Sequence, residues 1–186
     1  MRLALLLLAA LAAAPSPASA QLEWQVNGQA APGDRSRASR DGFGVMMMVT
    51  PDAQTFWRAW DGPTPPNLVT TDRAIRGQPV TGMVLFSGCG AGPDGNCNLT
   101  GEFIVLRPDG TRSGEPLRGS LWRGPPAPGY NVQLAEGSLG LIVEPEDPMG
   151  VWTLRAIVTD NVRGVTLQVE QQVTVDTPPS ASAPST

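Results

Sequence analysis

Residues 151–175 read VWTLRAIVTDNVRGVTLQVEQQVTV, and this stretch decides the fold. Apolar and polar side chains alternate over residues 151–159, where Val151 and Ile157 are apolar exceptions on the polar face. They alternate again over residues 165–175, where Gln171 alone breaks the pattern. Such alternation is typical of strands with one buried face and one wet face. Because the linking segment DNVRG is short and polar, the sequence predicts an antiparallel hairpin.

Weaker strand signals precede this hairpin. Apolar runs of strand length occur at residues 44–50, 79–87, 102–106 and 139–143, and Gly and Pro occur between them. Residues 52–60, DAQTFWRAW, fit either a strand or a short helix capped by Asp52. Many short strands without a long amphipathic helix predict an all-β sandwich or barrel.

The corner before the hairpin carries a family resemblance. Residues 147–152, DPMGVW, lead directly into the first strand of the hairpin. They resemble the Asp-x-Gly-x-Tyr corner that often precedes the penultimate strand of immunoglobulin-like and fibronectin-type-III-like sandwiches. Here one extra residue separates Asp147 from Gly150, and Trp152 replaces the tyrosine. The resemblance covers residues 139–175 and implies an antiparallel immunoglobulin-like β-sandwich with an irregular N-terminal region.

Residues 1–20 have the three parts of a secretory signal peptide. Arg2 supplies the positive charge, residues 3–14 are an apolar run of Leu and Ala, and residues 18–20 read ASA. We therefore expect cleavage before Gln21 and a periplasmic or secreted location. We expect no membrane span afterwards, because no later apolar stretch reaches about 20 residues. The chain also resembles small exported bacterial proteins, which implies no particular activity.

The remaining organisation follows from composition. We expect a weak first strand and a polar linker at residues 21–41, a β-sandwich domain at 42–176, and a disordered tail at 177–186. The chain has no His, and all 13 of its basic side chains are Arg. These absences exclude a Ser–His–Asp triad, His metal ligands and Schiff-base lysines. No cofactor is expected. A net charge of −4 without a basic patch argues against nucleic-acid binding.

The two cysteines flank a short loop. Cys89 and Cys97 enclose GAGPDGN, and in an oxidising compartment we expect them to form a disulfide. Two Cys without His cannot complete a typical zinc site. Within and beside the loop, Asp94, Asn96 and Asn98 follow the D-x-N-x-N spacing of calcium ligands only in part. Turn formation is the alternative, and no metal is predicted.

Two other groups of residues are candidate sites. Trp57 and Trp60 in FWRAW, and Trp122 beside a Pro-rich loop, could stack on sugars or anchor a partner, although such rings more often pack in a core. The three consecutive methionines at residues 46–48 are predicted to fill the core in the same way. Glu144, Glu146 and Asp147 form an acidic cluster that could serve acid–base chemistry.

These features favour a non-enzymatic, exported protein. It would act by contact with an unknown protein or ligand in the cell envelope, through its loops or a free sheet edge. One alternative is carbohydrate or envelope-glycan binding through exposed tryptophans. The other is a carboxylate-based hydrolase that uses the acidic cluster.

Overall fold

A computed structural model describes residues 25–26, 29–30, 35–60, 68–128 and 131–178. The predicted signal peptide and most of the predicted C-terminal tail therefore lie outside the described residues. One helix, α1 (Ala53–Trp60), occurs in these ranges, and it is far too short to cross a membrane. The strands are β1 (Gln25–Val26), β2 (Gln29–Ala30), β3 (Arg37–Arg40), β4 (Phe43–Thr50), β5 (Arg73–Ile75), β6 (Val80–Ser87), β7 (Cys97–Leu106), β8 (Leu117–Gly124), β9 (Gln133–Leu141), β10 (Val151–Asp160) and β11 (Val165–Asp176).

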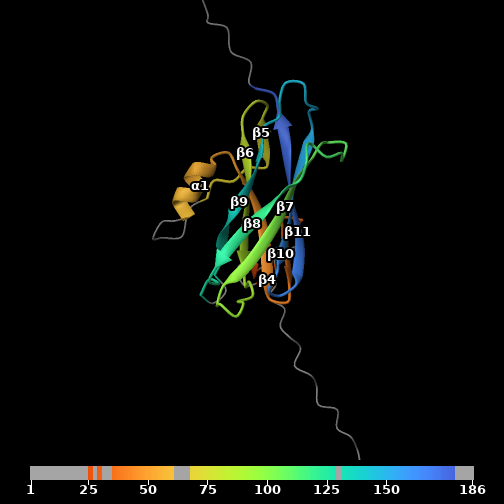
Figure 1. The fold of residues 1–186 in the computed structure, drawn as a ribbon. Helices are drawn as coiled ribbons and strands as arrows, with labels where there is room; N and C mark the ends of the chain where they lie inside the picture. The colour runs from red at the N-terminus through yellow and green to blue at the C-terminus, as the bar shows by residue number, and fades with distance from the viewer. Residues whose placement is uncertain (1–24, 27–28, 31–34, 61–67, 129–130, 179–186) are drawn as a thin grey trace, which may run out of the picture.

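Two sheets pack face to face (Figure 1). One has the strand order β5-β11-β10-β7-β8, and the other has the order β3-β4-β6-β9. Strands β1 and β2 form a separate two-stranded sheet. Neighbouring strands of the two main sheets are antiparallel, apart from β5, which runs parallel to β11. The predicted all-β sandwich is confirmed, because two mostly antiparallel sheets form its two layers.

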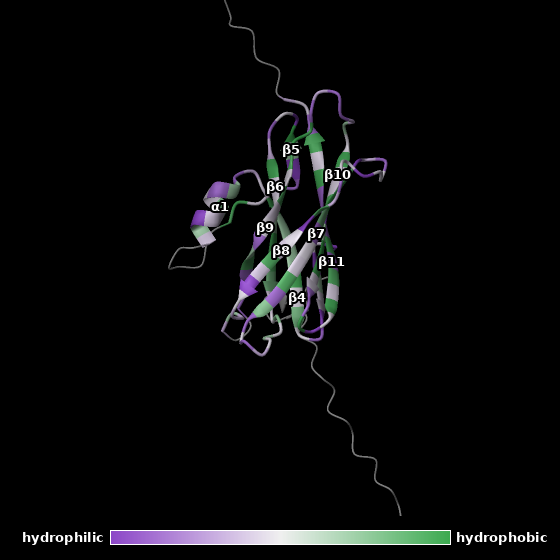
Figure 2. Ribbon diagram, viewed as in Figure 1, coloured by the Kyte–Doolittle hydropathy of each residue, from purple (hydrophilic) through white to green (hydrophobic). Residues whose placement is uncertain are grey.

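The core lies between the two sheets and is built from alternate residues of each strand. The predicted inward face of the hairpin is confirmed, because Trp152, Leu154, Ala156 and Val158 are each at most 1% exposed. They belong to the same apolar cluster as Phe86 of the opposite sheet. Figure 2 shows the strands banded with apolar colour, while the turns at both ends are mostly polar.

The corner before β10 is held by the indole of Trp152, the residue that replaces the tyrosine of the predicted motif. The Nε1–H group of Trp152 donates a hydrogen bond to the carbonyl oxygen of Pro148 at 3.1 Å. Gly150 follows with φ of 135°, and its carbonyl accepts a bond from the Val175 amide. Only glycine adopts this backbone conformation without strain, so the extra residue in the corner is accommodated there.

Helix α1 settles the ambiguity of residues 52–60. Asp52 caps it, since its Oδ1 accepts the backbone N–H of Thr55 at 2.9 Å and its Oδ2 accepts the Thr55 hydroxyl at 2.6 Å. The helix inserts Phe56, which is 2% exposed, into a second apolar cluster with Met83, Leu85 and Leu134. Of the three consecutive methionines, Met47 lies in the main core, while Met46 and Met48 are half-buried beside this second cluster.

The polar linker predicted within residues 21–41 is wrong in part, because residues 37–40 form β3 and pair with β4. Strands β5 and β8 carry no clear sequence signal and are not predicted. Both are edge strands of the five-stranded sheet. The first four residues of β8 are all exposed and only Leu117 among them is apolar, so this half of the strand shows no clear alternation.

Candidate functional site

Three connections meet at one end of the sandwich, which we call the stapled-loop end (Figure 1). Residues 88–96 join β6 to β7, residues 161–164 join β10 to β11, and residues 41–42 join β3 to β4. Two of these connections join antiparallel neighbours within one sheet, and residues 88–96 cross from the four-stranded to the five-stranded sheet. The strand registers place all three at the same end, because the start of β4 lies beside the end of β6 and the start of β7 lies beside the end of β10. Loops grouped in this way at one end of a sandwich are the usual place for a binding surface.

The predicted disulfide between Cys89 and Cys97 is confirmed. The two Cα atoms lie 5.9 Å apart, and both cysteines are almost completely buried. Within the loop, the Gly92 amide donates to the Asn96 carbonyl at 2.8 Å, and the Gly95 amide donates to the Gly92 carbonyl at 2.9 Å. The staple and these two bonds fix the backbone of the loop.

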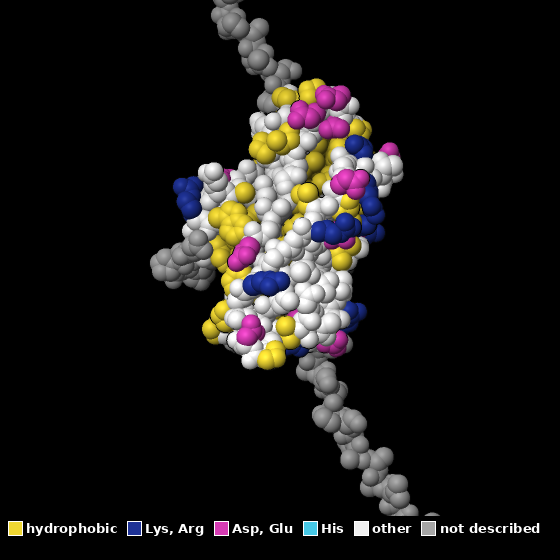
Figure 3. All heavy atoms as spheres, in the orientation of Figure 1, with side chains coloured by type: hydrophobic (Ala, Val, Ile, Leu, Met, Phe, Trp, Pro, Cys, Tyr) yellow, Lys and Arg dark blue, Asp and Glu magenta, His cyan; other side chains and the backbone are white. Residues whose placement is uncertain are grey.

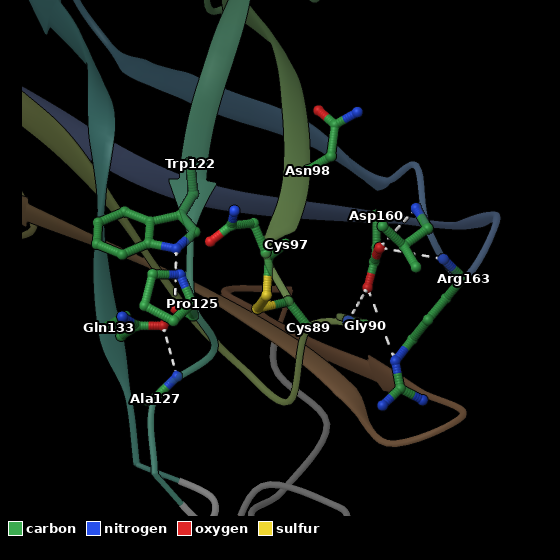
Figure 4. The surroundings of a disulfide bond; sticks show 12 residues. Cys89, Gly90, Cys97, Asn98, Trp122, Pro125, Ala127, Gln133, Asp160 and Arg163 are labelled. Carbon is green, nitrogen blue, oxygen red and sulfur yellow. Dashed lines mark hydrogen bonds and ion pairs between the residues drawn. A yellow bond between two sulfur atoms is a disulfide. The ribbon is translucent and has the colours of Figure 1, made fainter. Parts of the chain in front are cut away.

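A buried carboxylate joins the disulfide loop to the β10–β11 turn (Figure 4). Asp160 is fully buried, and its Oδ2 accepts the backbone N–H of Gly90 at 2.7 Å. Its Oδ1 accepts the amides of Val162 and Arg163 at 3.0 and 3.1 Å. The Arg163 Nε lies 3.7 Å from Oδ2 and provides the nearby positive charge. A Cβ at Gly90 would meet the Arg163 side chain at 2.7 Å, so the close approach requires glycine.

Further contacts tie the remaining parts of this end together. The Arg163 Nη1 donates to the carbonyl of Asp41 at 2.8 Å, which attaches the β3–β4 turn. Asn161 donates both its backbone amide and its side-chain Nδ2 to the Asn98 carbonyl, each at 3.0 Å. The three connections are therefore a single hydrogen-bonded unit rather than independent loops.

An open hollow of about 410 Å³ lies beside the disulfide. Its lining includes Pro93, Asp94, Asn96, Asn98, Arg123 and Val162. Arg123 is exposed, and Val162 leaves 41% of its surface in water. The Oδ1 of Asn98 is buried and has no hydrogen-bond partner among the described residues. The hollow thus combines an apolar contact point with a positive charge.

The predicted D-x-N-x-N motif behaves as a turn. The backbone and side-chain amides of Asn96 donate to the Asp94 carboxylate, both at 3.1 Å. The backbone bond, followed by the side-chain bond, lowers the pKa of Asp94 below its ordinary value. In the part of the chain that the structure describes, no group of three or more His, Cys, Asp or Glu residues is arranged to hold a metal.

The structure does not gather the three candidate tryptophans into one site. Trp122 lies beside the stapled-loop end, where its ring packs 5.7 Å from that of Phe86 and its Nε1 donates to the Pro125 carbonyl at 3.3 Å. Trp57 and Trp60 lie on α1 and pack against the second apolar cluster. All three rings are half-buried. Figure 3 shows the apolar side chains that gather beside α1.

The acidic cluster occupies the opposite end of the molecule, where acidic side chains gather in Figure 3. Glu144 and Glu146 are exposed. The Asp147 Oδ2 accepts the Glu144 amide at 3.0 Å, and the Asp147 carbonyl accepts Arg76 Nη2 at 2.6 Å. Asp147 therefore stabilises the turn that precedes β10.

Sequence reasoning missed Asp160, Arg163, Val162 and Arg123. The segment DNVRG gives a signal for a turn, and Asp160 does form one. Its burial depends on the disulfide loop, which is 70 residues away in sequence. A sequence pattern among neighbouring residues therefore cannot predict the contact between Asp160 and the disulfide loop.

No protein-family model matches the chain, and no curated protein sequence does. Solved structures that match include an alkylpurine DNA glycosylase from Pseudomonas fluorescens (12% identity, 72% of this chain and 30% of that one, TM-score 0.39). A family 123 glycoside hydrolase from Clostridium perfringens matches with 8% identity over 72% of this chain and 27% of that one (TM-score 0.40). A CARDB domain from Pyrococcus furiosus, with 12% identity, matches over 78% of this chain and 99% of its own length (TM-score 0.35). The chain thus spans less than a third of the first two proteins.

Proposed function

We propose that this is an exported, non-enzymatic binding protein that contacts a protein partner in the cell envelope through its stapled-loop end. The observation that supports this function is the locking of three loops by the disulfide and Asp160. Loops that are already ordered lose little conformational entropy when a partner binds, so more of the contact energy is available as affinity.

The exposed chemistry of this end also suits a protein partner. Val162 and Pro93 offer apolar surface, and Arg123 offers an exposed guanidinium at the hollow that forms no ion pair with the residues the structure describes. Arginine is enriched in protein interfaces, and the buried centre of an interface is more apolar than its rim. The disulfide supports the export part of the proposal, since such bonds persist in the periplasm and outside the cell.

The test is a capture experiment from native periplasm, with a tag on residues 177–186. The chain has no Lys, so amine-reactive cross-linkers should be avoided. Three baits are compared: the native protein, Val162→Asp at the stapled-loop end, and Leu117→Asp on β8. Leu117 is a matched control, because it is an exposed apolar residue away from the loops.

We expect one stoichiometric protein partner with the native bait and with Leu117→Asp, and its loss with Val162→Asp. Equal recovery by all three folded baits would contradict the proposed surface. Recovery of no partner by the native bait would contradict a protein partner.

Glycan binding is the second candidate function, and the place of Trp122 favours it. This half-buried ring borders the stapled-loop end, beside the Pro-rich segment that follows β8 (Figure 4). Aromatic rings stack on sugars when one face is accessible. Tryptophan fluorescence of the native protein and of Trp122→Phe should be compared during titration with envelope glycan fragments. A saturable change that disappears in the variant supports this function, and an unchanged spectrum across the panel contradicts it.

A further inference from the structure

Along one open side of the sandwich, two short segments lie end to end: residues 35–36, which lead into β3, and residues 71–72, which lead into β5. A gap lies between these two segments. On the five-stranded sheet, the Arg35 carbonyl accepts the Glu170 amide at 2.7 Å, and the Asp72 carbonyl accepts the Thr174 amide at 2.8 Å. On the four-stranded sheet, the Ser36 carbonyl accepts the Met47 amide and the Thr71 amide donates to the Val49 carbonyl, each at 2.8 Å. The two segments therefore bridge both sheets and leave an opening between them.

We call this opening the side gap. It is a hollow of about 310 Å³ lined by Ser36, Arg37, residues 46–49, residues 70–72 and Gln171. It is separate from the stapled-loop end, since the two hollows share no lining residue. Two of its polar residues have no explanation in the packing of the fold.

The first is Arg37, which is half-buried. Its Nε is buried without a hydrogen-bond partner, and its guanidinium forms no ion pair with any residue that the structure describes. A buried polar group without a partner is costly. A guanidinium that lines a hollow is suited to a planar carboxylate, which can accept two parallel N–H bonds.

The second is Gln171, the residue that breaks the alternation of β11. It lies between Val169 and Val173, which are both fully buried, and it shares their side of the strand. An apolar residue would extend the core at this position. Instead a half-buried amide lines the side gap, and it can donate to a ligand oxygen. Departures from a consistent pattern of this kind are expected at functional sites.

Besides these two polar residues, the side gap has an apolar wall. Arg37 and Met46 are directly opposite in the β3–β4 register, so their side chains lie on the same face of the sheet. Met46 and Met48 line the side gap and also pack against the second apolar cluster beneath α1. Asp72 is exposed at the same hollow, and its negative charge disfavours multiply charged anions such as phosphate.

We propose that the side gap binds a carboxylate attached to an apolar group. The carboxylate contacts Arg37 and Gln171, and the apolar group lies against Met46 and Met48. Both a small acylated amino acid and the C-terminal residue of a peptide have this chemistry. This site is independent of the proposed function at the stapled-loop end.

The test is a titration of the full chain labelled with ¹³C at its methionine methyl groups. The probes are N-acetyl-leucine, its uncharged amide, acetate and inorganic phosphate. We expect saturable shifts of the Met46 and Met48 signals with N-acetyl-leucine, and no saturable shifts with the other three. A peptide that ends in leucine and its C-terminal amide then distinguish the sources. Tighter binding of the free-acid peptide indicates a peptide terminus, and tighter binding of N-acetyl-leucine indicates a small acid.

Three variants make the assignment falsifiable. Arg37→Gln should weaken binding by at least about tenfold, because hydrogen bonds between charged groups contribute the most to such sites. Gln171→Val should weaken binding and at the same time raise the unfolding midpoint, since it restores the apolar face of β11. Arg112→Gln is the matched control, because it removes an exposed guanidinium away from the gap. The absence of any shift with N-acetyl-leucine, or equal affinity in Arg37→Gln, would overturn the proposal.

Discussion

At the scale of single residues, the arrangement of the stapled-loop end depends on Asp160. Its carboxylate accepts three backbone amides and contacts Arg163 while fully buried. In Asp160→Asn, the amide nitrogen cannot accept a bond, so at least one amide loses its partner. We expect a loss of about 2 kcal/mol in the free energy of unfolding, the range for buried bonds to a charged group.

Urea denaturation of the native protein and the variant measures this loss. Asp94→Asn is the matched control, because Asp94 is exposed and its turn can form equally well with an asparagine. Equal unfolding midpoints for Asp160→Asn and the native protein would show that the buried carboxylate does not hold the loops.

At the scale of elements, the sequence predicts best where one face of a strand is buried and the other is wet. Strands β10 and β11 satisfy that condition along most of their length, and their predicted bounds differ from the observed ones by a single residue at the end. Strand β8 begins with four exposed residues, and β5 has only three residues, so neither strand shows a clear alternating pattern in the sequence.

The candidate site could not be predicted from the sequence for a related reason. Its cysteines are visible in sequence, but the partner of the loop, Asp160, is brought there only by the sheet topology.

Helix α1 gives a pH-dependent prediction. Hydrogen bonds from the Thr55 hydroxyl and then the Thr55 amide hold the pKa of Asp52 below its ordinary value of 3.8. A carboxyl group with a lowered pKa stabilises the folded state above its unfolded pKa, and this contribution is lost as the pH falls through the folded pKa. We therefore expect the first turn of α1 to loosen below pH 3.8, as measured by the chemical shift of the Thr55 amide. Asp52→Asn keeps a capping oxygen that does not titrate, so the same acid-induced shift in that variant would contradict this cause.

The disulfide loop gives the second prediction at this scale. Cys89 and Cys97 are separated by 8 positions, and closure of so short a loop contributes about 2.5 kcal/mol in the chain-entropy model. We expect the double variant Cys89→Ala/Cys97→Ala to lose stability of this order in urea denaturation. Reduction of the native protein should give the same loss, and it should leave the double variant unchanged. An unchanged midpoint in both cases would mean that the hydrogen bonds of Asp160 and Gly92 fix the loop without the staple.

At the scale of the whole molecule, the fold keeps its two proposed sites apart. The stapled-loop end is formed by connections between strands, whereas the side gap lies between two edge segments that bridge the sheets. The hydrogen-bond networks of the two sites share no side chain among the described residues. Substitutions at one site should therefore leave the other unchanged, as is usual for distant positions.

The oxidised cysteine pair and the predicted N-terminal signal together give a testable prediction for the mature protein. If residues 1–20 direct export, the protein recovered from its native cell should lie in the periplasm or the medium and begin at Gln21. Intact-mass spectrometry would then show the loss of 20 residues, the loss of two hydrogens for the disulfide, and the loss of ammonia if Gln21 cyclises. Alkylation before and after reduction provides the control, because only the reduced sample should add two labels. A cytoplasmic protein that keeps residues 1–20 and carries two free thiols would contradict export, and with it the proposal of a partner in the cell envelope.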